Sequence, residues 1–205
     1  MSITDRRQRQ KEEVRTLILD AAWEMVVTEG WPSFSIRKIA DAIEYSVPVI
    51  YSHFENKDAI LLEFNRKGFR LLAERMEKAK SGKEYPAAQI DAMAHAYWDF
   101  AFTNYQYYQL MFGLGIPTCE TARKIPEMNG FKDAVCASIE ALTPAGRKAS
   151  VDPFLKYQSF WSMLHGLVSI NMVGNIVEKQ ASEHGGLAEM VLNDVIGSFI
   201  KGIVS

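Results

Sequence analysis

The sequence predicts an all-α protein, with a small N-terminal three-helix domain followed by a larger helical domain. Apolar residues recur at the three-to-four spacing of a helix face over several long stretches. No stretch shows the sustained alternation of apolar and polar residues that is typical of a strand. The chain has 205 residues, 48% of them hydrophobic and 23% charged, which suits a soluble protein with a real core. No apolar run approaches the roughly 20 residues that are needed to cross a bilayer.

Two short helices joined by a tight turn are predicted to follow a longer N-terminal helix. The longer helix fills residues 14–29, has an unbroken apolar face and ends at Gly30. Ser35 and Ser46 stand where they can cap the two short helices, and residues 44–45 mark the break between them. This order of elements is that of a helix-turn-helix reading head.

The second short helix is predicted to bury one edge and to expose another. Ile50 and Phe54 lie four residues apart and therefore share the buried edge. The opposite face is left to Val47, Pro48, Val49, Tyr51 and His53. A helix this short cannot stand alone, so we expect it to be held out on a scaffold.

The stretch IRKIADAIEYSVPVIYSHFENKDAIL resembles the DNA-binding domain of the TetR family of bacterial transcriptional regulators. The resemblance covers about residues 10–65 and rests on capping, spacing and helix order. Its matching residues are Gly30, Ile39-Ala40, Tyr51-x-His53-Phe54 and Asn56-Lys57-Asp58. The family usually has glycine in the turn, where this chain has Glu44. Because glycine suits a left-handed backbone, we expect the glutamate to be modestly strained there or to shift the turn.

The resemblance also implies which residues contact DNA. Positions at which TetR-family proteins contact DNA are matched here by Arg37, Pro48, Tyr51, His53 and Lys57, and the predicted DNA-binding set adds Lys38, Ser46, Val47 and Val49. Arg37 can bind a guanine edge or a phosphate, and Pro48 and Val49 can contact thymine methyl groups. Tyr51, His53 and Lys57 can donate to phosphates, and Val47 is a weaker candidate for the groove-facing side. Tyr45 either faces the groove or packs under the turn. The alternative is a solvated surface on an unrelated three-helix module.

The overall charge does not favour nucleic-acid binding. The formal net charge of the chain is −2, and residues 1–60 hold eight Lys/Arg against ten Asp/Glu. Positive charge must therefore be local, in residues 6–15 and around Arg37, Lys38 and Lys57. We expect few phosphate contacts and a shallow dependence of affinity on salt.

A long helix is predicted from Asn56, as its cap, to about Lys80, and it crosses from the first domain into the second. The domains are placed at residues 1–60 and 61–205. The further helices are expected at about 87–103, 104–112, 128–142, 152–176 and 187–203. The last two are apolar on nearly every side, and we therefore expect them to form the interface of a symmetric homodimer.

The second domain contains the stretch FWSMLHGL, which resembles the tryptophan-histidine-glycine type of C-terminal domain found in some TetR-family regulators. The resemblance implies an effector-binding and dimerisation domain. The candidate ligand-binding residues are Met93, Tyr97, Trp98, Tyr108, Met111, Phe112, Trp161 and His165. Plain core is the alternative for each of them. For the histidine, a satisfied interior position is favoured over a place in a pocket or an interface.

No pattern in the sequence favours an enzyme. Nucleophile–base pairs, paired carboxylates in an apolar setting and a phosphate loop after a strand are all missing, and no cofactor or metal is predicted. His95 and His184 have no liganding partners at metal spacing, and Cys119 and Cys136 are expected to be free thiols in a reducing cytoplasm. The N-terminus lacks the apolar block of a secretory signal.

The sequence therefore predicts a dimeric DNA-binding transcriptional regulator, a repressor that a small apolar effector releases from a palindromic operator. The alternative is a helical scaffold or partner-binding protein without sequence-specific DNA binding.

Overall fold

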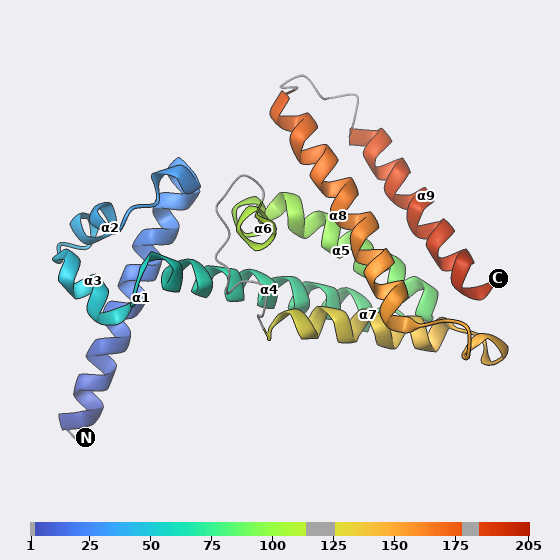
Figure 1. Ribbon diagram of the computed structural model, residues 1–205, viewed down its shortest axis with the longest axis horizontal. Helices are drawn as coiled ribbons and strands as arrows, with labels where there is room; N and C mark the ends of the chain where they lie inside the picture. Colours follow the sequence, from blue (N-terminus) through green and yellow to red (C-terminus); the bar gives the residue numbers. More distant parts are fainter. Residues whose placement is uncertain (1–2, 114–125, 178–184) are drawn as a thin grey trace. The chain divides into compact units, whose positions relative to one another are not determined.

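The computed structural model describes residues 3–113, 126–177 and 185–205, which form nine α-helices and no strand (Figure 1). The all-α prediction is confirmed. The described residues separate into two compact units, one made of residues 3–66 and 109–113 and the other of the remainder. None of the helices in these ranges combines the length and the hydropathy that a membrane crossing requires.

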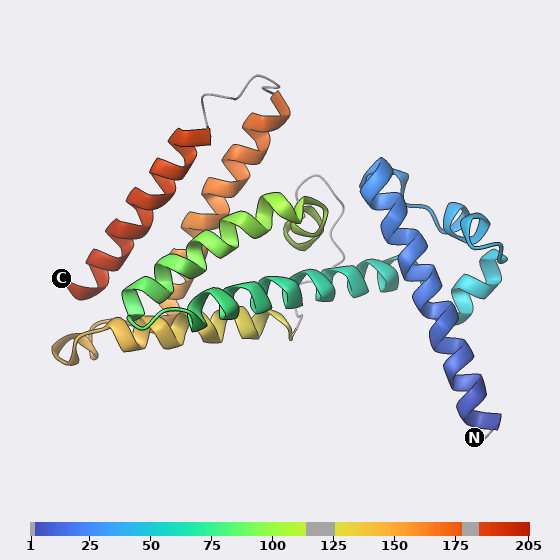
Figure 2. The ribbon, with the colours of Figure 1, turned by 180° about the vertical axis from the view of Figure 1, so that it is seen from behind.

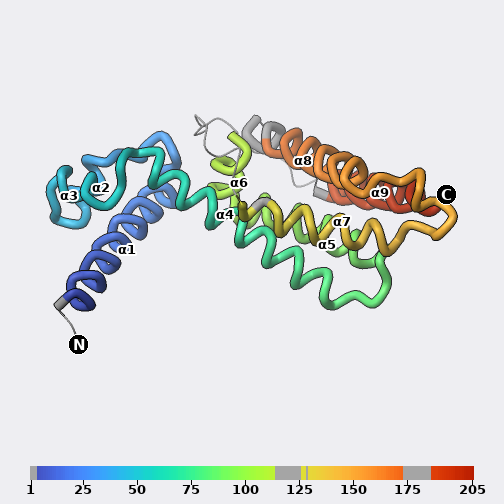
Figure 3. The backbone as a smooth tube through the Cα atoms, turned by 60° about the horizontal axis from the view of Figure 1, so that its bottom comes forward, coloured from blue at the N-terminus to red at the C-terminus, as the bar shows by residue number. Residues whose placement is uncertain are grey.

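The first unit contains α1 (Ile3–Glu29), the 3-10 helix η1 (Trp31–Ser33), α2 (Ile36–Ala42), α3 (Val47–His53) and the beginning of α4 (Lys57–Ser81). Both short helices pack against α1 (Figure 3). Gly30 ends α1 as predicted, with a φ of 81°.

The predicted start of α1 at residue 14 is wrong, because the helix begins at Ile3. Residues 4–13 are exposed and polar, so they carry no apolar period that could mark them as helical. They are rich in arginine, glutamine, lysine and glutamate, which favour helix on their own. Gln8 also donates a hydrogen bond of 2.9 Å to Glu12, one turn further on.

The turn between α2 and α3 keeps the left-handed backbone that the family's glycine would adopt. Glu44 has a φ of 58°, and within the described residues no other non-glycine residue has a positive φ. The Tyr45 N–H donates to the Ala40 carbonyl at 2.9 Å, which closes the end of α2. Of the two expectations for this glutamate, strain without a shift is therefore the one observed. The left-handed conformation costs a residue with a Cβ roughly 1–2 kcal/mol.

The second unit contains the rest of α4, α5 (Pro86–Thr103), α7 (Met128–Leu142), the 3-10 helix η3 (Ala145–Arg147), α8 (Pro153–Val177) and α9 (Gly185–Val204). The division between the units falls within α6 (Tyr105–Phe112) as well as within α4. All these helices lie close to their predicted bounds. Helices α8 and α9 run side by side (Figure 2), and α5 packs against α7, α8 and α9. The core of this unit includes Tyr97, Phe100, Tyr108 and Phe160, each no more than 1% exposed.

Candidate nucleic-acid interface and effector site

Helix α3 buries the predicted edge and exposes the predicted face in part. Ile50 is 0% exposed and Phe54 is 3% exposed, so these two side chains fasten the helix to the first unit. Tyr51 is 50% exposed. Ser46 and Pro48 are exposed as well, whereas Val47 and Val49 are half-buried. Tyr45, whose place was left open, is 42% exposed.

Ser35 and Ser46 occupy the predicted N-cap positions of α2 and α3, but neither side chain makes the predicted capping hydrogen bond. In α3 the reason is local. Pro48 has no N–H to offer, and the Val49 N–H donates to the Ser46 carbonyl at 2.9 Å. The Ser46 hydroxyl therefore has no free backbone N–H in the first turn of α3 from which it could accept a hydrogen bond. By contrast, the predicted cap of α4 is confirmed, because Asn56 Oδ1 accepts from the Ala59 N–H at 2.9 Å.

The three basic residues that are predicted to contact DNA differ in whether another residue already holds their side chains. Arg37 is exposed in the first turn of α2, and its side chain forms no ion pair or hydrogen bond with the part of the chain that the structure describes. Lys38 forms an exposed ion pair of 3.0 Å with Glu29. An exposed pair of this kind is worth at most about 1 kcal/mol, so a phosphate can replace the carboxylate. Lys57 starts α4, with its Nζ 5.0 Å from the centre of the Phe34 ring.

His53 ends α3 and is half-buried. Burial, reinforced by the positive charges of Lys11 and Arg15, lowers its pKa below 6.5, so the imidazole is neutral at pH 7. Its Nδ1 is buried and has no hydrogen-bond partner among the described residues. The predicted phosphate contact would therefore rely on a neutral N–H rather than on a charge.

Arg15 is a residue of this site that the sequence analysis missed. Its guanidinium donates to the His53 carbonyl at 3.3 Å, pairs with Glu63 at 2.9 Å and lies 4.3 Å from the centre of the Phe54 ring. Its partners are 38 or more residues away in the sequence, so no local pattern points to them. The only available signal was a basic residue beside the apolar stripe of α1.

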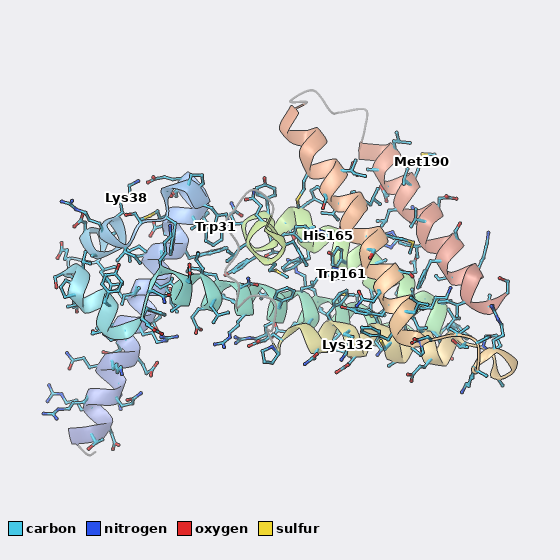
Figure 4. The ribbon with its side chains drawn as sticks, viewed as in Figure 1. Trp31, Lys38, Lys132, Trp161, His165 and Met190 are labelled. Carbon is cyan, nitrogen blue, oxygen red and sulfur yellow. The ribbon has the colours of Figure 1, made fainter. Side chains whose placement is uncertain are left out.

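In the second unit, four of the candidate ligand-binding residues form one aromatic cluster from α5, α6 and α8, three of them joined by hydrogen bonds. The Tyr97 and Tyr108 hydroxyls are 2.9 Å apart, and the Tyr108 hydroxyl is 2.7 Å from His165 Nδ1. Trp161 lies one turn before His165 on α8, with ring centroids 6.0 Å apart (Figure 4). His165 is half-buried and hydrogen-bonded to Tyr108, and its role as an interior, pocket or interface residue stays a prediction.

The cluster is neutral at pH 7. Burial raises the pKa of Tyr97 well above its usual value, and Tyr108 adds to the effect. Burial also raises the pKa of Tyr108 and lowers that of His165. Either phenol can donate the hydrogen bond between Tyr97 and Tyr108, and the donor of the bond between Tyr108 and His165 Nδ1 depends on the tautomer of His165.

The other four candidates do not belong to this cluster. Met93 is 0% exposed in the core, and the Trp98 ring packs on Phe102 at 4.7 Å. Met111 and Phe112 group with the first unit. The structure thus brings together half of the predicted set.

Helices α8 and α9 carry large apolar side chains that the described residues leave exposed. Ile170 is 72% exposed and Met190 is 68% exposed (Figure 4). A Cβ added at Gly166 or Gly197 would meet nothing within 4 Å. Phe199, in contrast, is 8% exposed because it packs on Phe160 at 5.6 Å.

The described residues hold no group of three His, Cys, Asp or Glu side chains that could bind a metal ion. Cys136 is a half-buried free thiol, and burial raises its pKa. Cys119 and His184 lie outside the described residues.

A three-helix head with an exposed recognition helix, joined to a larger helical unit, defines a helix-turn-helix regulator fold. Residues 18–64 match the family model of bacterial regulatory proteins of the tetR family, and residues 90–195 match that of the tetracyclin repressor-like C-terminal domain. The chain belongs to the TetR family. The family consists of transcriptional regulators, so the prediction that the chain is not an enzyme is confirmed. The tryptophan-histidine-glycine type stays a prediction.

Among curated proteins, the chain is similar to the uncharacterized HTH-type transcriptional regulator YobS of Bacillus subtilis, with 30% identity over 93 residues. The match covers 45% of this chain and 48% of YobS, so the chain spans about half the length of the curated relatives it matches.

Two solved structures share the fold. FadR from Bacillus subtilis, in complex with stearoyl-CoA, aligns with a TM-score of 0.64 and 18% identity over 93% of this chain and 98% of that one. AibR, in complex with isovaleryl coenzyme A and operator DNA, aligns with a TM-score of 0.60 and 18% identity over 88% of this chain and 95% of that one.

Proposed function

We propose that the protein is a homodimeric transcriptional repressor that binds a palindromic operator and leaves it when a small apolar effector binds. The observation that carries the proposal is the exposed face of α3, on which Tyr51 is half-exposed. Arg37 on α2 is exposed too, and its side chain forms no ion pair or hydrogen bond with the described residues. These are side chains of the types that read base edges and bind phosphates. Net acidity of the chain is compatible with this role, because the contacts need only local positive charge.

The proposed effector site lies among the aromatic residues of the second unit. Its polar groups are few and come from α5, α6 and α8, and the residues around them are apolar, as in many small-molecule sites. FadR and AibR, which share the fold, were solved with acyl-CoA molecules. We therefore choose an acyl chain carried by coenzyme A as the first effector to test.

The proposed dimer uses the uncovered surface of α8 and α9. Large exposed apolar side chains such as Ile170 and Met190 are costly in a monomer. The open space over Gly166 and Gly197 would let a second backbone approach closely. A two-fold axis through this surface would place two heads on one DNA duplex.

Effector binding would act through a shift of population. Helix α4 is continuous across the division between the units at Arg66, so both units contain part of it. An effector that prefers one arrangement of this helix lowers the population that fits DNA. The alternative of a scaffold without DNA binding was motivated partly by Glu44, and that motive weakens because the turn keeps its left-handed backbone.

Selection of bound fragments from random DNA tests the proposal. The expected result is enrichment of palindromes whose half-sites lie about one helical turn apart or somewhat more. Stearoyl-CoA and isovaleryl-CoA are then added to the complex, with coenzyme A alone as the control. Lack of enrichment would contradict DNA reading, whereas enrichment without release by any acyl-CoA would contradict only this choice of effector.

A further inference from the structure

We infer that Arg15 is a positioning residue for DNA recognition: it holds the C-terminal end of α3 in place and does not itself bind phosphate. The inference rests on the proposed reading of DNA by α3. Arg15 comes from α1, and its contacts reach α3, the residue after α3, and α4.

The guanidinium of Arg15 makes a hydrogen bond, an ion pair and a contact with an aromatic ring. One nitrogen, Nη1, donates to the His53 carbonyl, while Nη2 pairs with Glu63 Oε1 at 2.9 Å. The plane of the group lies against the Phe54 ring, 4.3 Å from its centre. The Arg15 and Glu63 side chains are 31% and 30% exposed, so the pair is partly shielded from water. The hydrogen bond and the ion pair use one N–H each of the five on the guanidinium, and Glu63 already neutralises the charge that would attract a phosphate.

The end of α3 needs such a partner. The helix has seven residues, so its last turn leaves carbonyl groups without helical partners and carries the negative end of the helix dipole. Arg15 supplies both a donor and a positive charge there. Only Phe54, Glu55 and Asn56 separate α3 from α4, so a rotation at His53 would change the direction of the exposed face.

The charged groups around this point are arranged to keep Arg15 in place. Burial is the main cause of the lowered pKa of His53; Lys11 and Arg15 on α1 add to it, and Glu12 opposes it. Arg66, one turn further along α4, also contacts Glu63 at 3.5 Å. The anchor on α4 is therefore a single carboxylate shared by two arginines.

The test compares Arg15→Met with Arg7→Met on the same helix, because Arg7 lies on the exposed polar stretch of α1. A selected duplex and an unrelated duplex of equal length are titrated at several salt concentrations. For Arg15→Met we expect about a tenfold loss on the selected duplex, less than about a twofold loss on the unrelated one and no change in salt slope. Arg7→Met is expected to weaken both duplexes alike and to reduce the salt slope by about one per head.

Arg15→Lys should recover part of the lost affinity, since it keeps the charge but loses the fork and most of the ring contact. Equal loss on both duplexes with a reduced salt slope would make Arg15 a phosphate contact and overturn the inference. Wild-type behaviour of Arg15→Met would overturn it too. If Arg15→Met does not fold, Glu63→Gln replaces it, because that variant removes the ion pair and leaves the arginine in the protein.

Amide hydrogen exchange provides a measurement that does not depend on DNA. In Arg15→Met we expect exchange at His53 and Phe54 to rise at least about tenfold, with α2 unchanged. If the wild type selects no DNA, the proposed function fails, and the exchange result still decides whether Arg15 holds α3. Unchanged exchange at these amides would refute the positioning role.

Discussion

Replacement of Glu44 by glycine should stabilise the first unit, because Glu44 holds a left-handed backbone with a φ of 58°. That conformation costs a residue with a Cβ roughly 1–2 kcal/mol. Glycine gives back about 0.5–1 kcal/mol of this gain through the greater freedom of the unfolded chain. The net expectation is a rise of about 0.5–1 kcal/mol in the free energy of unfolding, or about 1–4 °C in melting temperature.

The control for this substitution is Glu44→Ala, which removes the carboxylate and keeps the Cβ. Glu44 lines the same hollow as Asp20, Glu24 and Glu29, so part of any gain could come from relieved repulsion between carboxylates. Urea denaturation of the three proteins separates the two causes. A glycine variant that gains no more than the alanine variant would refute the argument from backbone strain.

Three further predictions concern the DNA interface, the histidines and the dimer. Arg37→Ala should cost about 1–3 kcal/mol on the selected duplex and flatten the preference at one position per half-site, whereas Lys57→Ala should weaken all duplexes alike, as salt-dependent titrations would show. Burial holds the pKa values of His53 and His165 below 6.5, so the unfolded chain binds protons first as the pH falls. Their contribution to stability is complete above about pH 6.5 and is lost as the pH falls through the folded pKa values. The urea midpoint should therefore be lower at pH 5 than at pH 7.5. The difference between the two midpoints should be smaller in His165→Gln. Met190→Asp, at a position that is 68% exposed, should shift sedimentation toward monomer without lowering the content of helix.

Each of these expectations has an outcome that would contradict it. If Arg37→Ala leaves base preference untouched, the arginine is a phosphate anchor or a structural residue. An equal urea midpoint at both pH values would contradict the lowered pKa values. A wild-type monomer at micromolar concentration would exclude the proposed dimer. Phe199→Asp, which the apolar pattern alone would suggest as an interface mutation, should instead unfold the protein, because Phe199 packs on Phe160.

The helices could be predicted where apolar residues follow the helical period and where glycine or proline ends the pattern. Helices α5, α7, α8 and α9 therefore begin and end close to the predicted residues. The start of α1 could not be predicted in this way, because a polar, solvated helix has no apolar face that would reveal its helical period. Its helicity comes from intrinsic propensity and from local pairs such as Gln8–Glu12, which are weak signals in a sequence.

The orientation of α3 could be predicted because two apolar residues four apart define its buried edge. What holds that orientation could not. A guanidinium chooses its partners by geometry, and the partners of Arg15 lie on elements that the fold alone brings near α1. The missing capping bond of Ser46 could not be predicted either. Ser46 stands at the predicted N-cap position, but the Val49 N–H that its hydroxyl could reach already donates to the Ser46 carbonyl.

The aromatic cluster of the second unit shows which contacts the tryptophan and the histidine of the FWSMLHGL stretch make. Trp161 and His165 lie one turn apart on α8 with their rings in contact, and His165 forms a hydrogen bond with the buried Tyr108 hydroxyl. The Tyr108 hydroxyl also forms a hydrogen bond with Tyr97, so it joins α5 to α8. A ligand that competes for the Tyr108 hydroxyl would have to replace its hydrogen bonds to Tyr97 and His165. The carbonyl oxygen of an acyl thioester can accept one from this hydroxyl, which is a reason to test an acyl-CoA as the first effector.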